Sequence, residues 1–232
     1  MGIRIDLWFG SPSMTRRLVR LRPGALGATG GEFVFTTAQY ESGDWDSAPL
    51  VPANLIDSVA RYTSIPVAPQ GAIVPLASDA LLRHPLVYLT GHLPVRFGEA
   101  ERANLRRFLD RGGILFVDDH NHDVDGMFHK TATEELARVA GPLAELPNDD
   151  PLYRAFFTFA DGPPTTSHEL NGWGDNLVHK HLLAARRGDR IAVLYSNKDY
   201  SSEWNFHPEN KRFQSVDTTR FGVNIVVYAL TR

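Results

Sequence analysis

The densest cluster of reactive side chains in this sequence lies at residues 118–125. The segment reads Asp-Asp-His-Asn-His-Asp-Val-Asp, which places four carboxylates and two imidazoles within eight residues. His120 and His122 are separated by one residue, and in an extended or looped segment such side chains can point the same way. We therefore predict that Asp118, His120 and His122 bind a divalent ion such as Zn, Mn or Ni. The alternative is a hydrated acidic turn.

The residues that could work with this cluster follow other apolar segments. Residues 33–37, 86–90 and 114–117 are mostly apolar, which is typical of buried strands. In an open parallel sheet, ligands bind beyond the carboxyl ends of the strands, so the three ends should meet at one edge. At that edge we expect His92 and Asp119 to be catalytic, with His92 as an acid–base group or a further metal ligand and Asp119 close to the ion. The residues expected to bind the substrate are Gln39, Tyr40, Gly91 and Trp204.

The remaining histidines have weaker signals. Apolar residues in 177–185 follow helical spacing, so His179 and His181 are predicted to lie on a helix and to face nearly opposite sides. They could not then hold the same ion. His168 and His207 lie in polar loops, and either could supply a third metal ligand or a general base. The aromatic residues expected to line a pocket, or to anchor long loops, are Trp45, Tyr200 and Trp204.

The elements that would position these residues alternate between strands and helices. Helices are predicted over 52–62, 99–111, from 131 to just before Gly141, and over 217–230, where 223–227 could instead be a strand. A further strand is predicted over 191–195. This alternation predicts an α/β fold with a mostly parallel sheet and helices on both faces. Residues 1–31 are expected to be an irregular extension, and 32–232 a single domain.

The composition narrows the classes of function. The chain has 232 residues, 43% of them hydrophobic, and a net charge of −3, so a nucleic-acid-binding surface is not expected. Cysteine is absent, which excludes disulfides and cysteine nucleophiles. No apolar run reaches the ~20 residues of a membrane span. No apolar segment follows the two arginines in 14–18, so we expect a cytoplasmic protein, with the periplasm as the alternative.

Several nucleotide and hydrolase motifs are missing. The early glycines do not spell GxGxxG, and the chain has no GxxxxGK[ST] loop and no GxSxG elbow. The Thr90-Gly91 turn could approach a phosphate, but no basic residue flanks it closely. We therefore expect neither a flavin nor a nucleotide as cofactor.

Four stretches carry a family resemblance: residues 88–92, 105–113, the pair at 118 and 119, and 222–230. Together they resemble a bacterial family of unknown function that is grouped with the class I glutamine-amidotransferase-like folds, which are flavodoxin-like. The resemblance covers about 32–232 and implies a three-layer sandwich. Amidotransferases place a cysteine after a central strand. The matching region here, Val117–His120, has none, so amidotransferase chemistry is excluded.

Two interpretations of function follow. The first is a metal-assisted hydrolase or lyase acting on a small polar molecule, such as a carbohydrate. The second is a non-catalytic module that binds a small ligand or a partner on the same fold. Convergence of the His120 and His122 ring nitrogens would favour the enzyme, and rings satisfied by backbone groups would favour the binding module. The sequence leaves open whether the protein is an enzyme, and makes no prediction of its oligomeric state.

Overall fold

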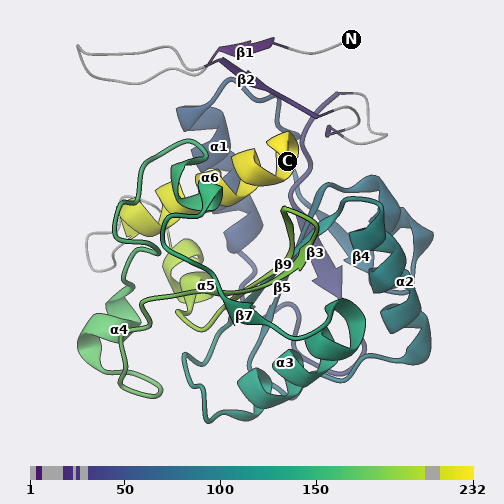
Figure 1. Ribbon diagram of the computed structural model, residues 1–232, viewed down its shortest axis with the longest axis vertical. Helices are drawn as coiled ribbons and strands as arrows, with labels where there is room; N and C mark the ends of the chain where they lie inside the picture. Colours follow the sequence, from purple (N-terminus) through teal and green to yellow (C-terminus); the bar gives the residue numbers. More distant parts are fainter. Residues whose placement is uncertain (1–3, 7–17, 23–24, 27–30, 207–214) are drawn as a thin grey trace.

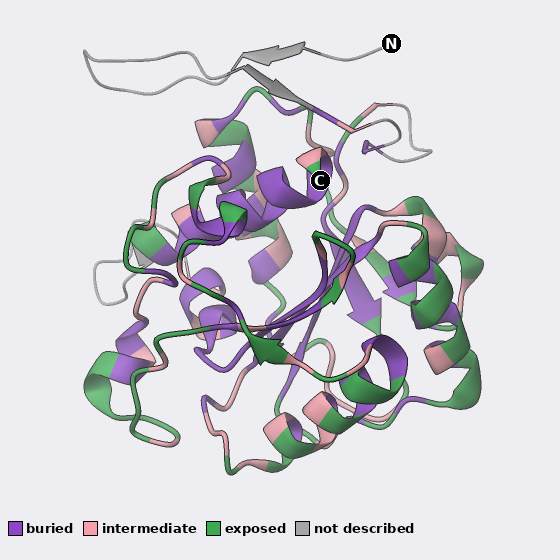
Figure 2. Ribbon diagram, in the orientation of Figure 1, coloured by how far each residue is buried: buried purple, intermediate pink, exposed green. Residues whose placement is uncertain are grey.

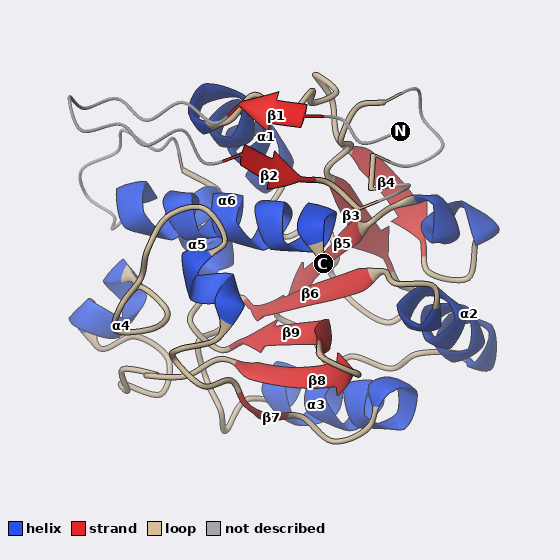
Figure 3. Ribbon diagram, turned by 45° about the horizontal axis from the view of Figure 1, so that its top comes forward, coloured by secondary structure: helices blue, strands red, loops and turns tan. Residues whose placement is uncertain are grey.

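The computed structural model describes residues 4–6, 18–22, 25–26, 31–206 and 215–232. Its centre is a seven-stranded sheet with the order β4-β3-β5-β6-β9-β8-β7 (Figures 1 and 3). The parallel strands are β3 (Thr36–Gln39), β4 (Ala72–Pro75), β5 (Leu86–Gly91), β6 (Ile114–Asp119) and β9 (Arg190–Ser196). At one edge, β8 (Leu183–Arg187) pairs antiparallel with both β9 and β7 (Ala144–Glu145). The α/β class and the mostly parallel sheet are confirmed.

The helices are α1 (Val51–Tyr62), α2 (Glu99–Asp110), α3 (Met127–Ala140), the short α4 (Ser167–Asn171) and α5 (Tyr200–Trp204), and α6 (Ser215–Thr231). Helices α1 to α4 lie between strands along the chain, and α5 and α6 follow the last strand, β9. Two 3-10 turns, Asp79–Arg83 and Pro151–Arg154, complete the set. No helix in the described ranges is long and apolar enough to cross a membrane.

The central strands β5 and β6 are buried along their whole length, as their apolar sequences predict (Figure 2). Alternate residues of β5 and β6 fall into two separate hydrophobic clusters, because successive strand side chains point to opposite faces. Tyr88 and Phe116 share one cluster with residues of α1 and α6. Leu89 and Val117 share the other with residues of α2 and α3.

Local signals account for several helix ends. Pro52 occupies the first turn of α1, where its missing N–H costs nothing. Gly112 follows α2 with a φ of 98°, a conformation that favours glycine. The capping-box start predicted at Thr131 is wrong, because α3 begins at Met127. Thr131 instead donates to Met127 O at 2.6 Å and accepts from the Val95 N–H at 2.8 Å.

Two further expectations are corrected. The helix predicted around 177–185 is absent: Leu183–Arg187 is strand β8, because antiparallel pairing with β9 overrides local helical spacing. The lead-in is also not wholly irregular. Arg4–Asp6 and Leu18–Arg20 pair antiparallel, and the Arg22 N–H donates to Leu230 O at 3.0 Å. Leu21 and Leu26 belong to the main hydrophobic cluster, so part of the lead-in packs with the domain.

Candidate functional site

His92 follows β5 and is held by a carboxylate from the loop after β3. Asp44 Oδ1 accepts the backbone N–H groups of His92 and Leu93 at 2.9 and 3.0 Å, and Oδ2 lies 2.8 Å from His92 Nδ1. Burial opposes ionisation of Asp44, but these hydrogen bonds outweigh it and lower its pKa. An ionised carboxylate only accepts, so Nδ1 carries the ring proton and Nε2 is the atom available for proton transfer. The His92 side chain is 42% exposed.

Gly91 and Tyr40 support this pair. A Cβ at Gly91 would lie 2.3 Å from the Tyr40 hydroxyl and 2.8 Å from Asp44 Oδ1. The Tyr40 hydroxyl is itself buried and donates to Thr90 O at 3.0 Å. The predicted substrate-binding role of Tyr40 is therefore replaced by a supporting one, and Gly91 is needed for close packing under Asp44.

His120 lies directly against His92. The two rings stack with centroids 4.2 Å apart and planes inclined by 25°. Parallel pairing of β5 and β6 brings them together: Asn121 Nδ2 donates to His92 O at 2.9 Å, and the His120 N–H donates to Gly91 O at 3.3 Å. Burial lowers the pKa of His120, against the attraction of Asp199. The expected meeting of these two strand ends is thus present.

Asp199 continues the same line of groups. It has a left-handed φ of 55° just before α5, and Oδ1 accepts the Ser202 N–H at 2.9 Å and lies 3.7 Å from His120 Nε2. Asp199 Oδ2 pairs with His168 Nδ1, and this hydrogen bond raises the pKa of His168. The exposed Trp173 stacks on the His168 ring, with centroids 5.1 Å apart and planes at 6°. We call Asp44, His92, His120, Asp199 and His168 the histidine row.

Asp118 and Asp119 are turned away from the solvent. Asp118 is fully buried, and Oδ2 accepts both the N–H and the hydroxyl of Ser201 at 2.6 Å. Burial raises the pKa of Asp118 to about 8 and that of Asp119 to about 7. Asp119 Oδ1 accepts the Asn121 N–H at 2.9 Å, which helps to shape the turn after β6. The catalytic role expected of Asp119 stays a prediction.

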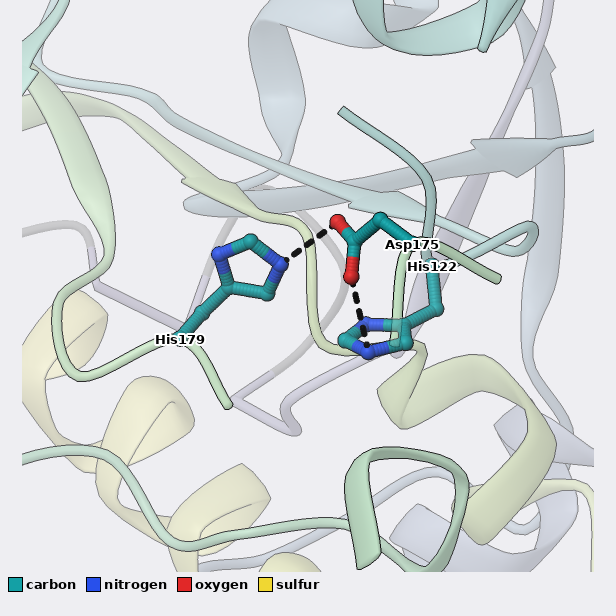
Figure 4. A group of neighbouring side chains, drawn as sticks. All are labelled: His122, Asp175 and His179. Carbon is teal, nitrogen blue, oxygen red and sulfur yellow. Dashed lines mark hydrogen bonds and ion pairs between the residues drawn. The ribbon is translucent and has the colours of Figure 1, made fainter. Parts of the chain in front are cut away.

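The metal site predicted at Asp118, His120 and His122 is not assembled. His122 has a left-handed φ of 51°, and its buried ring nitrogens face the backbone oxygens of Asn197 and Leu177. Among the residues the structure describes, the one group of histidine and acidic side chains close enough to share an ion is His122, Asp175 and His179 (Figure 4). His120 and His122 therefore do not converge, and the His122 ring contacts backbone oxygens. By the criterion stated for this pair, metal-assisted catalysis there loses its support and the binding module gains it.

The other expected site residues have mixed outcomes. Trp204 is buried in the core, donates from Nε1 to Thr218 O at 2.9 Å and stacks on the buried Tyr200, so its predicted pocket role is wrong. Trp45 also packs against a core cluster. Gln39 is exposed at the end of β3 and stays a prediction. His207 lies outside the described residues.

Sequence reasoning missed Asp44, Asp199 and Trp173. Asp44 lies in the turn just after the first strand end, and that position was its one available signal. Asp199 is the N-cap of α5, and a capping position in the sequence does not indicate that the side chain also contacts a histidine.

Comparison with known proteins adds a family. The family described as a domain of unknown function, DUF4159, matches residues 34–230. No curated protein matches the chain.

Proposed function

The chain belongs to the DUF4159 family, a domain of unknown function, and we propose from its site that it is an acid–base hydrolase or lyase acting on a small polar molecule. The observation that carries the proposal is the contact between Asp44 and His92 Nδ1 at 2.8 Å. A carboxylate that fixes the tautomer of a partly exposed histidine leaves Nε2 ready to take a proton from water or from a substrate. This pairing is common in enzymes that use histidine as a general base.

His168, at the far end of the histidine row from His92, supplies the general acid that complements this base. The hydrogen bond with Asp199 raises the pKa of His168, which favours the protonated, proton-donating form of the ring. Burial lowers the pKa of His120, so this ring is suited to remain neutral between His92 and His168. Proton transfer in hydrolysis or elimination requires a group that accepts a proton and a group that donates one, and His92 and His168 are placed to take these two roles.

The substrate class follows from the surroundings of the row. Trp173 is 62% exposed and lies flat on His168, so its ring offers an apolar surface beside polar, ionisable groups. This combination suits a polar molecule with a ring, such as a carbohydrate. The finer fold, a flavodoxin-like and glutamine-amidotransferase-like sandwich with helices on both faces, belongs to the same proposal. The strand order and the two core clusters support it.

The experiment compares two histidines at opposite ends of β5. His92→Gln removes the base, whereas His84→Gln changes a histidine that precedes the strand and contacts Thr36. Both variants and the parent are assayed on a panel of p-nitrophenyl esters and glycosides. We expect His92→Gln to reduce kcat/KM by roughly 10²–10⁴ and His84→Gln to leave it within about twofold.

Two results would change the assignment. Equal activity of His92→Gln and the parent would remove His92 from the chemistry. Saturable binding of a panel compound without turnover by the parent would favour the second function, a non-catalytic module that binds a small ligand.

A further inference from the structure

Three side chains outside the histidine row converge on one point. His122 comes from the turn after β6, and Asp175 and His179 come from the segment between α4 and β8 (Figure 4). One potential ligand atom from each lies within 4.8 Å of the other two. His179 Nε2 is 2.8 Å from Asp175 Oδ2, and His122 Nε2 is 3.5 Å from Asp175 Oδ1. The two imidazole rings meet nearly at right angles, with centroids 5.1 Å apart.

Both ring nitrogens of His122 face backbone oxygens. Its ring is fully buried, with Nδ1 2.6 Å from Asn197 O and Nε2 3.0 Å from Leu177 O. A neutral imidazole has only one N–H, so one of these nitrogens would direct a lone pair at an oxygen. A metal ion bound at Nε2 would remove this conflict, because a cation attracts the facing oxygen of Leu177.

The donor set favours the metal ion, and we propose that His122, Asp175 and His179 bind a zinc-type divalent cation. One ion would bind both imidazoles and the carboxylate at once, in place of the present contact between His179 Nε2 and Asp175 Oδ2 at 2.8 Å. The contact from His122 Nδ1 to Asn197 O is the outer hydrogen bond that metal-binding histidines usually make. Asn197 Oδ1 is buried and accepts no hydrogen bond among the described residues, so it offers a further oxygen close by. Two nitrogens with oxygen ligands suit zinc.

The backbone is shaped around this point. Gly174 has a φ of +62°, and a Cβ there would lie 1.9 Å from His122 O. The Asp175 N–H donates to the same oxygen at 2.9 Å. The loop is therefore pressed onto the turn after β6, and an ion would fasten the two together. Because Trp173 lies on this loop, the ion would also hold the indole against His168.

An approach route for the ion is present. His179 also lines a groove of about 870 Å³, together with Lys180 and His181. A mostly buried site with one ligand facing a groove can exchange its ion with solvent.

The test uses untagged protein stripped with a chelator and titrated with Zn²⁺ against a competing chromogenic chelator. We expect one equivalent of zinc in the parent and, because loss of an outer contact alone costs 10–100-fold, at least about a hundredfold weaker binding in His179→Ala. Asp175→Asn serves as a second variant. His181→Ala, on the same loop, and His120→Ala, in the histidine row, are the controls, and both should bind zinc as the parent does. Zinc should raise the Tm of the parent and of both controls, and leave that of His179→Ala unchanged.

Three outcomes would overturn the proposal. The parent could bind no zinc, His179→Ala and Asp175→Asn could bind it as tightly as the parent, or His120→Ala could lose it. The last outcome would move the ion to the histidine row. The zinc measurement does not depend on catalysis, so failure of the proposed activity leaves it intact.

Discussion

Asp118 offers a direct test of how the buried end of β6 is organised. Its carboxyl is fully buried, and burial together with the charge of Asp199 raises its pKa from 3.8 to about 8. Between these values the folded protein keeps a proton that the unfolded chain releases. The folded state therefore binds more protons, and the contribution of Asp118 to the free energy of unfolding falls as pH rises from about 4 to 8. Asp118→Asn abolishes this titration, since the amide stays neutral at every pH.

The size of the change in the free energy of unfolding follows from the shift in the pKa of Asp118. Each pH unit within the window is worth about 1.4 kcal/mol. Between pH 4.5 and pH 7.5, the free energy of unfolding of Asp118→Asn should therefore rise relative to the parent by about 4 kcal/mol. The two contacts from Ser201 to Oδ2 can be retained by the amide oxygen of the variant, so the comparison isolates the charge.

Urea unfolding across this pH range measures the difference. Asp57→Asn is the matched control, because Asp57 lies on α1 with a half-exposed side chain. Its stability profile should run parallel to that of the parent. If the Asp118→Asn profile also ran parallel, Asp118 would be ionised in the folded protein, and the reasoning from burial would be refuted.

Two further substitutions test the packing around Gly91 and the buried ion pair between Lys198 and Glu169. Gly91→Ala should reduce the free energy of unfolding by about 1–3 kcal/mol, because the added Cβ would overlap the Tyr40 hydroxyl and Asp44 Oδ1; urea unfolding measures the change, and a variant as stable as the parent would contradict the tight packing. Lys198→Met should reduce the free energy of unfolding by about 3–5 kcal/mol, because the fully buried Lys198 Nζ lies 2.6 Å from Glu169 Oε1 and its loss leaves that buried carboxylate without a cationic partner. Adding Glu169→Gln to Lys198→Met should restore much of the loss, and no recovery in the double variant would argue against the pair.

The element boundaries show what local sequence can determine. Pro52 and Gly112 mark helix ends by rules that involve only neighbouring residues, and the structure follows both. Thr131 has the spacing of a capping box, yet it lies inside α3, because that helix starts one turn earlier at Met127. A local motif predicts an end only where the surrounding chain does not extend the helix.

At the candidate site, too, some features follow from local sequence and others from tertiary contacts. Its place at the ends of β5 and β6 could be read from the apolar segments before His92 and His120, since parallel strands carry their ends to one edge. The partner carboxylates could not, because Asp44 and Asp199 reach these rings across long sequence separations. His122 faces away from His120 with a left-handed backbone and with its ring on the backbone oxygens of Asn197 and Leu177, and no spacing rule predicts either feature.

The sequence by itself determined the α/β class, the buried strands and the edge at which ionisable side chains collect. Periodic burial is a property of each segment, and it leaves a local pattern in the residues. Only the tertiary structure decided which histidine faces which carboxylate, that 183–187 is a strand, and that His122 joins Asp175 and His179. Those outcomes depend on loop conformations and on contacts between distant segments, whose free energies are settled only when the whole chain packs.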